Sequence, residues 1–375
     1  MAMRLSFLEP LYKEAGPFAS VYLDTSRDSA IEDPDSAIAL RWRHLRDDLL
    51  AEGADPESIA AVAGTVGDDV RVPGRHGQAL FTAHGKLVLQ DELPRPPAQD
   101  TAHFGALPDT MPLIAQHAPE IAYLAVRVYY TGRHSTDAEG TVRIDTEAGT
   151  WPLTKVTPGD RLHMEVPVVE WQHLAERLGR QLETQARRRG AETLVLAGDT
   201  WARGILARRL PTHLRSRLTT AEGGGQPEPG RALLESQLDR LFSGRMAAHD
   251  RTLLETFMAR RAHDGACAEG LAAAVAALQR GQVSALFLNN HPESPLRLWV
   301  GPEPGQLALT ESDLRVYGVT TVREERADAA LTRALVGTGA ELVLVPEEQL
   351  RLREGVGVLL RYADALRYGD EAQAA

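Results

Sequence analysis

The chain has 375 residues, more than one ordinary hydrophobic core organises, so its length predicts two or three domains. Hydrophobic residues make up 43% and charged residues 25%, the proportions of a soluble globular protein. No apolar run approaches the roughly 18 residues of a membrane span, and the N-terminal sequence has no apolar core of signal-peptide length. We therefore expect a cytoplasmic protein with no membrane partner. Its single cysteine, Cys267, excludes an internal disulfide and a CxxC zinc site.

The charge pattern disfavours a DNA-binding protein. The net charge is −11, whereas affinity for nucleic acid comes largely from neutralised phosphates. The basic residues are nevertheless 38 arginines against three lysines. Because a guanidinium group binds phosphate in a bidentate manner and stacks on bases, local arginine clusters could serve RNA. High genomic GC content explains the same bias without any function, and composition does not decide between the two.

The first predicted domain covers residues 1–112 and mixes strands with a helix. Residues 18–23 form an apolar strand, and 78–82 and 86–90 are two further strand candidates. Between the first and the second of these strands, the apolar spacing of residues 37–51 predicts a helix. Four leucines of this helix are expected to face inward and three arginines lie among its polar residues: Leu40, Leu45, Leu49 and Leu50, and Arg41, Arg43 and Arg46. The proline-rich sequence that ends this segment marks the domain boundary.

The second predicted domain covers residues 113–232. Two strands, at 121–130 and 141–146, precede residues 151–170, where three prolines and a glycine indicate a loop. A long helix follows from Trp171 to Arg189, with Gly190 as its C-cap. An apolar strand, a helix and another strand, at 193–197, 200–209 and 214–219, complete an α/β unit.

The third predicted domain covers residues 233–375. It begins with a long amphipathic helix at 233–261, after which helices and strands alternate up to a last strand in 355–362. Alternation of strands and helices is typical of sheets covered by helices. The predicted fold class is therefore α/β, with three domains that are each a mixed sheet with flanking helices.

One short motif suggests chemistry. Gly224-Gly225-Gln226 matches the tripeptide that peptide release factors place in the peptidyl transferase centre. Its glycines let the backbone approach closely, and its glutamine positions water for ester hydrolysis. The sequence has no P-loop, HExxH or GxSxG motif. Because a tripeptide in a glycine-rich connection is weak on its own, its position in the chain decides its meaning.

Four stretches resemble the archaeo-eukaryotic release factor and Pelota family, in the family's order. Thr193-Leu-Val-Leu-Ala-Gly198 resembles its middle-domain strand, and residues 269–288 resemble the helix-turn-strand opening of its third domain. Glu354-Gly-Val-Gly-Val-Leu-Leu-Arg-Tyr362 resembles its glycine-rich closing strand. Residues 14–24 are similar to actinobacterial members of the bacterial branch, which includes the ribosome hibernation factor Balon. The resemblance implies a three-domain, tRNA-mimicking arrangement.

The position of the Gly-Gly-Gln motif in the chain differs from that of the family's catalytic loop. In the family the catalytic loop lies before the long helix of the middle domain, and residues 151–170 fill that slot here without a Gly-Gly pair or a glutamine. Gly224-Gly225-Gln226 lies after the strand at 193–198, so we interpret it as a coincidence. The first domain also has no NIKS-type motif for reading stop codons. The resemblance therefore implies no catalytic residue, metal or cofactor. It implies a factor that occupies the ribosomal A site during stress and protects the decoding and peptidyl transferase centres.

The resemblance also implies partners: the 70S ribosome with its rRNA, and elongation factor Tu. We expect RNA to be recognised through shape, phosphates and 2′-hydroxyls. The candidate RNA contacts are basic side chains of the first helix, the 151–170 loop and the end of the long helix: Arg41, Arg43, Arg46, Lys155, Arg161, His163, Arg187, Arg188 and Arg189. Two alternatives stay open. One is a peptidyl-tRNA hydrolase or rescue factor that acts through Gln226 or the variant loop, and the other is a stress-linked α/β protein that binds a nucleotide or a protein.

Overall fold

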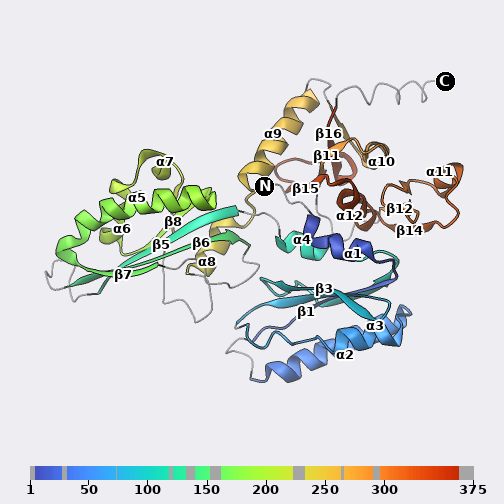
Figure 1. Ribbon diagram of the computed structural model, residues 1–375, viewed down its shortest axis with the longest axis horizontal. Coiled ribbons are helices and arrows are strands. Elements are labelled where there is room, and N and C mark those ends of the chain that lie inside the picture. The colour runs from blue at the N-terminus through green and yellow to red at the C-terminus, as the bar shows by residue number, and fades with distance from the viewer. Residues whose placement is uncertain are drawn as a thin grey trace. The chain divides into compact units, whose positions relative to one another are not determined.

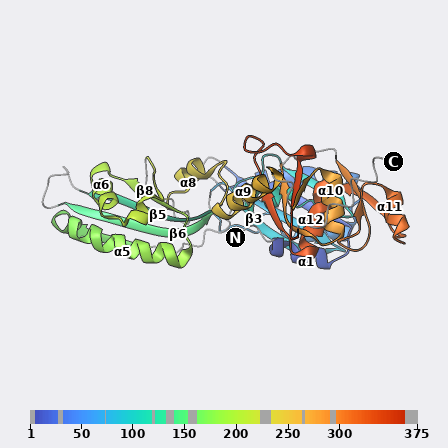
Figure 2. The same cartoon turned by 90° about the horizontal axis from the view of Figure 1, so that it is seen from above.

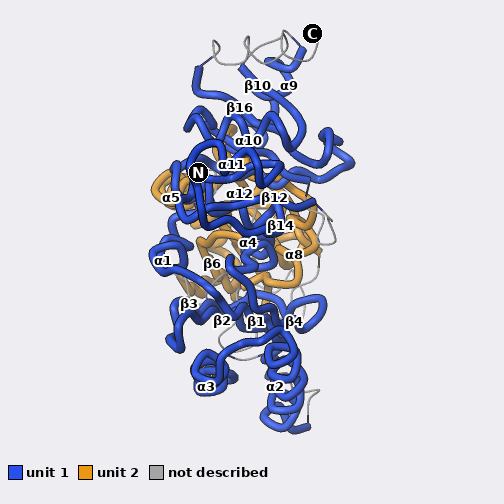
Figure 3. The backbone as a smooth tube through the Cα atoms, turned by 90° about the vertical axis from the view of Figure 1, so that its right-hand side faces the viewer, with its two compact units in different colours: residues 1–118, 249–375 blue, residues 119–248 orange. Residues whose placement is uncertain are grey.

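The computed structural model describes residues 5–27, 32–72, 74–117, 121–131, 140–152, 162–222, 233–262, 266–289 and 296–362. Its sheets with flanking helices confirm the predicted α/β fold class, and two of the four sheets combine parallel and antiparallel strands (Figure 1). The chain divides into two compact units: residues 1–118 with 249–375 form unit 1, and residues 119–248 form unit 2 (Figure 3). The three-domain division and the tRNA-like arrangement stay predictions. Within the described ranges, no helix combines the length and the apolar character that a bilayer span needs.

The N-terminal part of unit 1 is an antiparallel sheet with helices on both faces. The strand order is β3-β2-β1-β4, from β1 (Phe18–Asp24), β2 (Gly77–Ala83), β3 (Lys86–Leu93) and β4 (Thr101–Gly105). One face, with Val21 and Leu80, packs against α2 (Pro34–Ala51) and α3 (Pro56–Ala63). The other face, with Tyr22 and Phe81, shares a core with η1 (Leu5–Leu8), α1 (Glu9–Lys13) and α4 (Met111–His117).

Helix α2 confirms the helix predicted at 37–51, but two of its leucines do not face inward. The helix begins at Pro34, and the Asp33 side chain caps it by accepting a hydrogen bond from Ser36 N at 3.1 Å. Leu45 and Leu49 are buried as expected, whereas Leu40 is 50% and Leu50 52% exposed. Successive helical residues turn by about 100°, so Leu50 points well away from the stripe that Leu45 and Leu49 form. The inward prediction for Leu40 and Leu50 is therefore wrong.

The C-terminal part of unit 1 contains two sheets. The larger has the order β10-β16-β11-β15, from β10 (Cys267–Glu269), β11 (Val283–Leu288), β15 (Glu341–Leu344) and β16 (Val356–Leu360). The smaller has the order β13-β12-β14, from β12 (Arg297–Val300), β13 (Leu307–Ala308) and β14 (Arg323–Arg326). The helices of this part are α9 (Ala248–Ala262), α10 (Leu271–Gln279), α11 (Glu311–Val316) and α12 (Ala327–Thr338), and η3 (Arg353–Gly355) precedes β16.

One hydrophobic core joins the two parts of unit 1. Leu8 and Met111 from the N-terminal part belong to the same cluster of buried side chains as Leu331 and Leu335 of α12. Thr332 Oγ1 also lies 3.9 Å from Met111 Sδ. The first and last thirds of the chain therefore pack together, although unit 2 separates them in sequence.

Unit 2 is a five-stranded sheet with the order β7-β6-β5-β8-β9. Strands β5 (Ile121–Thr131), β6 (Thr141–Trp151) and β7 (Leu162–Pro167) are antiparallel neighbours, while β8 (Thr193–Gly198) and β9 (Leu218–Thr220) continue the sheet in parallel. One face packs against α5 (Trp171–Arg189), α6 (Thr200–Arg209) and α7 (Thr212–Arg215). Helix α5 runs along β5 and β6 (Figure 2). Helix α8 (Glu235–Phe242) packs on the opposite face.

Two predictions for this region need correction. Residues 162–170 are not a loop, because β7 pairs with β6 and is followed by η2 (Val168–Glu170), while residues 153–161 lie outside the described ranges. Met164 and Val166 of β7 are partly buried against the core under α5, and this packing holds the segment in the sheet. The helix predicted at 233–261 is two helices, α8 and α9, and between them Gly244 turns the chain with φ +72°.

Candidate functional site

The three arginines predicted on α2 have different surroundings. Arg41 is only 28% exposed and lies 3.4 Å from Asp24 Oδ2 and 3.5 Å from Asp100 Oδ2, so it ties α2 to the strands beneath it. Arg46 pairs with its neighbour Asp47 at 2.9 Å. Arg43 is exposed, and its guanidinium has no partner among the described residues. The structure therefore does not gather these three side chains into one open basic surface.

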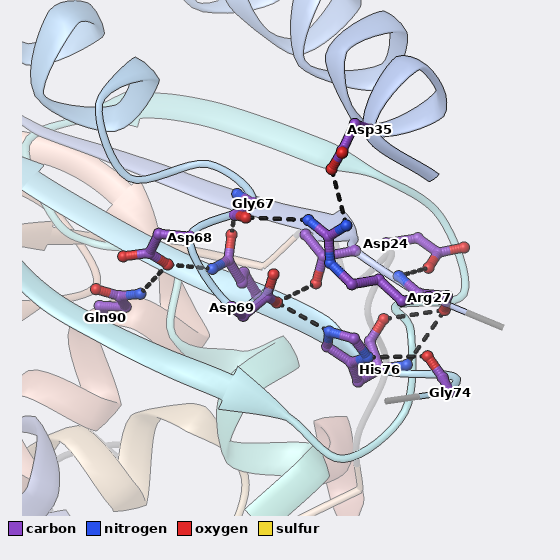
Figure 4. Close-up of polar contacts among 12 residues, drawn as sticks. Asp24, Arg27, Asp35, Gly67, Asp68, Asp69, Gly74, His76 and Gln90 are labelled. Carbon is purple, nitrogen blue, oxygen red and sulfur yellow. Dashed lines mark hydrogen bonds and ion pairs between the residues drawn. The ribbon is translucent and has the colours of Figure 1, made fainter. Parts of the chain in front are cut away.

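A buried polar cluster lies at the end of β1, near the start of α2, the helix that carries the three predicted arginines (Figure 4). Asp69 Oδ2 accepts hydrogen bonds from Thr25 Oγ1 at 2.5 Å and from His76 Nε2 at 3.0 Å. The other ring nitrogen, His76 Nδ1, lies 2.9 Å from the carbonyl oxygen of Gly74. The side chains of His76 and Asp69 are 3% and 7% exposed. A hydrogen-bonded pair enclosed in this way costs a great deal to break, because the remaining partner stays buried without compensation.

Arg27 extends the cluster to α2. Its guanidinium donates to Asp35 Oδ1 at 2.8 Å and to the carbonyl oxygen of Gly67 at 3.2 Å, while its backbone N–H donates to Gly74 at 2.8 Å (Figure 4). The cluster thus fixes the end of β1, the start of α2 and the turn before β2 in one arrangement. The sequence prediction missed it. The only signal was an acidic pair, Asp68-Asp69, followed by His76 in a connection punctuated by glycine, and spacing alone does not pair them.

A second polar group crosses β5, β6 and β7 and contains the predicted residue His163. His163 Nδ1 lies 2.6 Å from Asp145 Oδ1, and Arg127 Nη2 donates to Asp145 Oδ2 at 2.9 Å. Next to them Arg143 pairs with Glu165 and donates to Tyr129 Oη at 3.3 Å. His163 is 54% exposed but lies on a strand, and an acidic partner holds it. The other two basic residues predicted for this segment, Lys155 and Arg161, lie outside the described ranges.

The last predicted group, Arg187, Arg188 and Arg189, forms the final turn of α5. The helix ends at Gly190 with φ +64°, as the sequence predicted. All three arginines are exposed, and Arg187 donates to Glu183 Oε1 at 2.6 Å. Cations in a last turn interact favourably with the helix dipole, so this position also has a structural explanation. Contact of any of these side chains with RNA stays a prediction.

The Gly224-Gly225-Gln226 motif lies outside the described ranges. The chain is described again from Leu233, whose backbone N–H donates to both carboxylate oxygens of Glu147 at 3.2 Å. Glu147 also accepts from Tyr123 Oη at 3.3 Å, so the start of the segment that leads to α8 is anchored on β6. Among the described residues, no three side chains of His, Cys, Asp or Glu come together as metal ligands.

Comparison with known proteins points to one family. Residues 122–263 match the model of bacterial archaeo-eukaryotic release factor family 2. Two uncharacterized proteins of Mycobacterium tuberculosis, from strains CDC 1551 / Oshkosh and ATCC 25618 / H37Rv, are each 28% identical over 98% of this chain and 99% of their own length.

Two solved structures show a weaker likeness. Archaeoglobus fulgidus Pelota is 10% identical with a TM-score of 0.37, over 76% of this chain and 79% of that one. A second archaeal Pelota, from a ribosome-bound structure of Pelota and ABCE1, is 13% identical with a TM-score of 0.31, over 97% and 96%. Both TM-scores are low, and the match to the family model covers residues 122–263, less than half of the chain.

Proposed function

We propose that the protein binds the 70S ribosome and occupies its A site without catalysing hydrolysis, because residues 122–263 match the model of bacterial archaeo-eukaryotic release factor family 2. The family match is the observation that carries this proposal. A filled A site admits no tRNA, so binding alone stops translation and shields the decoding and peptidyl transferase centres. This is the action of a hibernation factor during stress.

Two features support a binding role without catalysis. In the family's catalytic slot before the long helix, residues 151–170 contain no Gly-Gly-Gln sequence. In the described part of that slot, β7 pairs with β6 and is held by core packing, so residues 162–167 do not project as a free tip. A steric blocker needs neither an activated water nor a placed glutamine, and it can spread its affinity over many modest contacts.

The proposed partners are rRNA and, for delivery to the A site, elongation factor Tu. RNA recognition through shape and phosphates suits a protein whose basic residues are nearly all arginine. Sedimentation of stationary-phase lysate on a density gradient tests the proposal. We expect the protein to travel with 70S particles and to leave them at high salt. A protein that stays at the top of the gradient at low salt would contradict ribosome binding.

A further inference from the structure

The positive charge of this acidic protein is concentrated in one stretch of unit 2. Residues 171–220 contain ten arginines and four acidic residues, while the whole chain carries 41 basic and 52 acidic residues. Nine of the ten arginines are exposed, and only Arg203 is partly covered. A composition bias toward arginine does not by itself separate the charges in this way.

The exposed arginines share one layer of helices. At Gly179 of α5, an added Cβ would lie 3.1 Å from the backbone oxygen of Arg209, so the end of α6 lies against α5. Helix α7 is attached to α5 by an ion pair of 3.3 Å between His213 and Glu183. Arg217, after α7, donates to the carbonyl oxygen of Ala191 at 3.1 Å. We call the solvent side of α5 from residue 177, the end of α6 and α7 the basic helix face.

Much of the charge on this face is not neutralised within the protein. Arg177, Arg188, Arg208 and Arg209 are exposed, and their guanidinium groups have no acidic partner among the described residues. Arg180 and Arg187 pair with Glu176 and Glu183, each across one exposed turn of α5. Exposed pairs of this kind contribute only a few tenths of a kcal/mol, roughly 0.3–0.5, so their arginines are easily redirected to a ligand.

We propose that the basic helix face is a docking surface for the phosphate backbone of double-helical RNA. Along α5, residues 177–189 span about 18 Å, long enough to follow several phosphates of a duplex. Guanidinium groups bind phosphate in a bidentate manner, and A-form RNA is recognised mainly by shape, phosphates and 2′-hydroxyls. The inference rests on the proposed function, because it names the part of the protein that would meet rRNA.

The side chains of the face favour RNA over a protein partner. Protein interfaces are anchored by apolar and aromatic side chains at their centre. Between residues 171 and 220, the exposed large hydrophobic side chains include only Trp201, at the start of α6. The basic helix face includes only the end of α6, and its described residues contain no such anchor. A surface of arginines without an apolar centre suits a ligand whose affinity comes from charge.

The test replaces the four unpaired arginines with glutamine in the full chain: Arg177→Gln, Arg188→Gln, Arg208→Gln and Arg209→Gln. A matched control makes the same charge change on unit 1, at exposed positions outside the face: Arg251→Gln, Arg297→Gln, Arg323→Gln and Arg351→Gln. Binding is measured to purified 70S ribosomes and to an RNA duplex of about 16 base pairs. Salt is varied between about 50 and 200 mM, and thermal unfolding of each variant is recorded.

We expect the face variant to bind both probes at least tenfold more weakly than the wild type, with unchanged thermal unfolding. The slope of log K against log salt should fall by roughly 3.6, about 0.9 for each of the four lost phosphate contacts. The control should match the wild type. If the wild type and the face variant bind ribosomes equally well and with the same salt slope, the inference is overturned. The proposed function then still stands.

Two other outcomes are distinct. Loss of ribosome binding in the face variant without any loss of duplex binding would mean that the face meets a ribosomal protein, and would also overturn the inference. Wild-type protein that binds no ribosomes at low salt would instead refute the proposed function.

Discussion

Gly198 is a position where we expect a single methyl group to destabilise unit 2. It ends β8 with φ +109°, a conformation that side chains rarely adopt, and an added Cβ would lie 1.9 Å from the backbone oxygen of Val128. The left-handed backbone costs roughly 1–2 kcal/mol for a residue other than glycine. The clash must also push β8 away from β5, where Asp199 N donates to that same oxygen at 2.8 Å. Losing this bond adds about 0.5–1.5 kcal/mol, so Gly198→Ala should cost about 1.5–3.5 kcal/mol in total.

A second glycine of unit 2 provides the control. Gly190 caps α5 with φ +64°, and an added Cβ there would meet nothing within 4 Å. Gly190→Ala should therefore cost only the backbone strain, about 1 kcal/mol. Urea unfolding is followed by tryptophan fluorescence, since three of the five tryptophans, Trp151, Trp171 and Trp201, belong to unit 2. Equal destabilisation by the two substitutions would refute the argument that the approach of β8 to β5 requires glycine.

Three further predictions concern buried charge and the absence of catalysis. Burial raises the pKa of Asp109 above its unfolded value of about 3.9, so its contribution to stability is complete below that value and is lost as pH rises through the folded pKa. Unfolding at pH 4 and pH 7 should therefore show that Asp109→Asn loses less stability with rising pH than the wild type. A parallel loss in both proteins would contradict this. Asp69→Ala should lower the free energy of unfolding in urea by about 3–5 kcal/mol, because it leaves His76 buried without its acidic partner. A loss under about 1 kcal/mol would show that this pair does not stabilise the fold. Gln226→Ala should change neither ribosome binding nor the release of peptide from loaded ribosomes, and wild-type release that the substitution abolishes would make the motif catalytic.

Local patterns predicted the elements best where burial follows one strong periodicity. The helix at 171–189 and its glycine cap are confirmed. Its buried side chains form one apolar stripe, and Gly190 in the left-handed conformation marks its C-terminal end. For α2, the presence of leucine did not identify the buried face of the helix, since Leu40 and Leu50 lie outside the buried stripe. Its inner face is set by Ile38, Leu45 and Leu49, which only the packed sheet identifies.

Errors arose where tertiary contacts decide the structure. Proline spacing made 151–170 resemble a loop, yet β6 continues to Trp151 and offers an edge on which residues 162–167 pair. The buried link between Asp69 and His76 depends on folding the turn before β2 back onto the end of β1. Of the predicted RNA contacts, Arg41 and His163 are held by acidic partners, which a single sequence does not show.

The most direct test of the central claim is competition for the A site. Purified protein would be mixed with 70S ribosomes whose A site is either empty or filled with tRNA, and binding would be measured by sedimentation. We predict stoichiometric binding to the empty ribosomes and displacement when tRNA fills the A site. Equal binding to both ribosome preparations would contradict occupation of the A site.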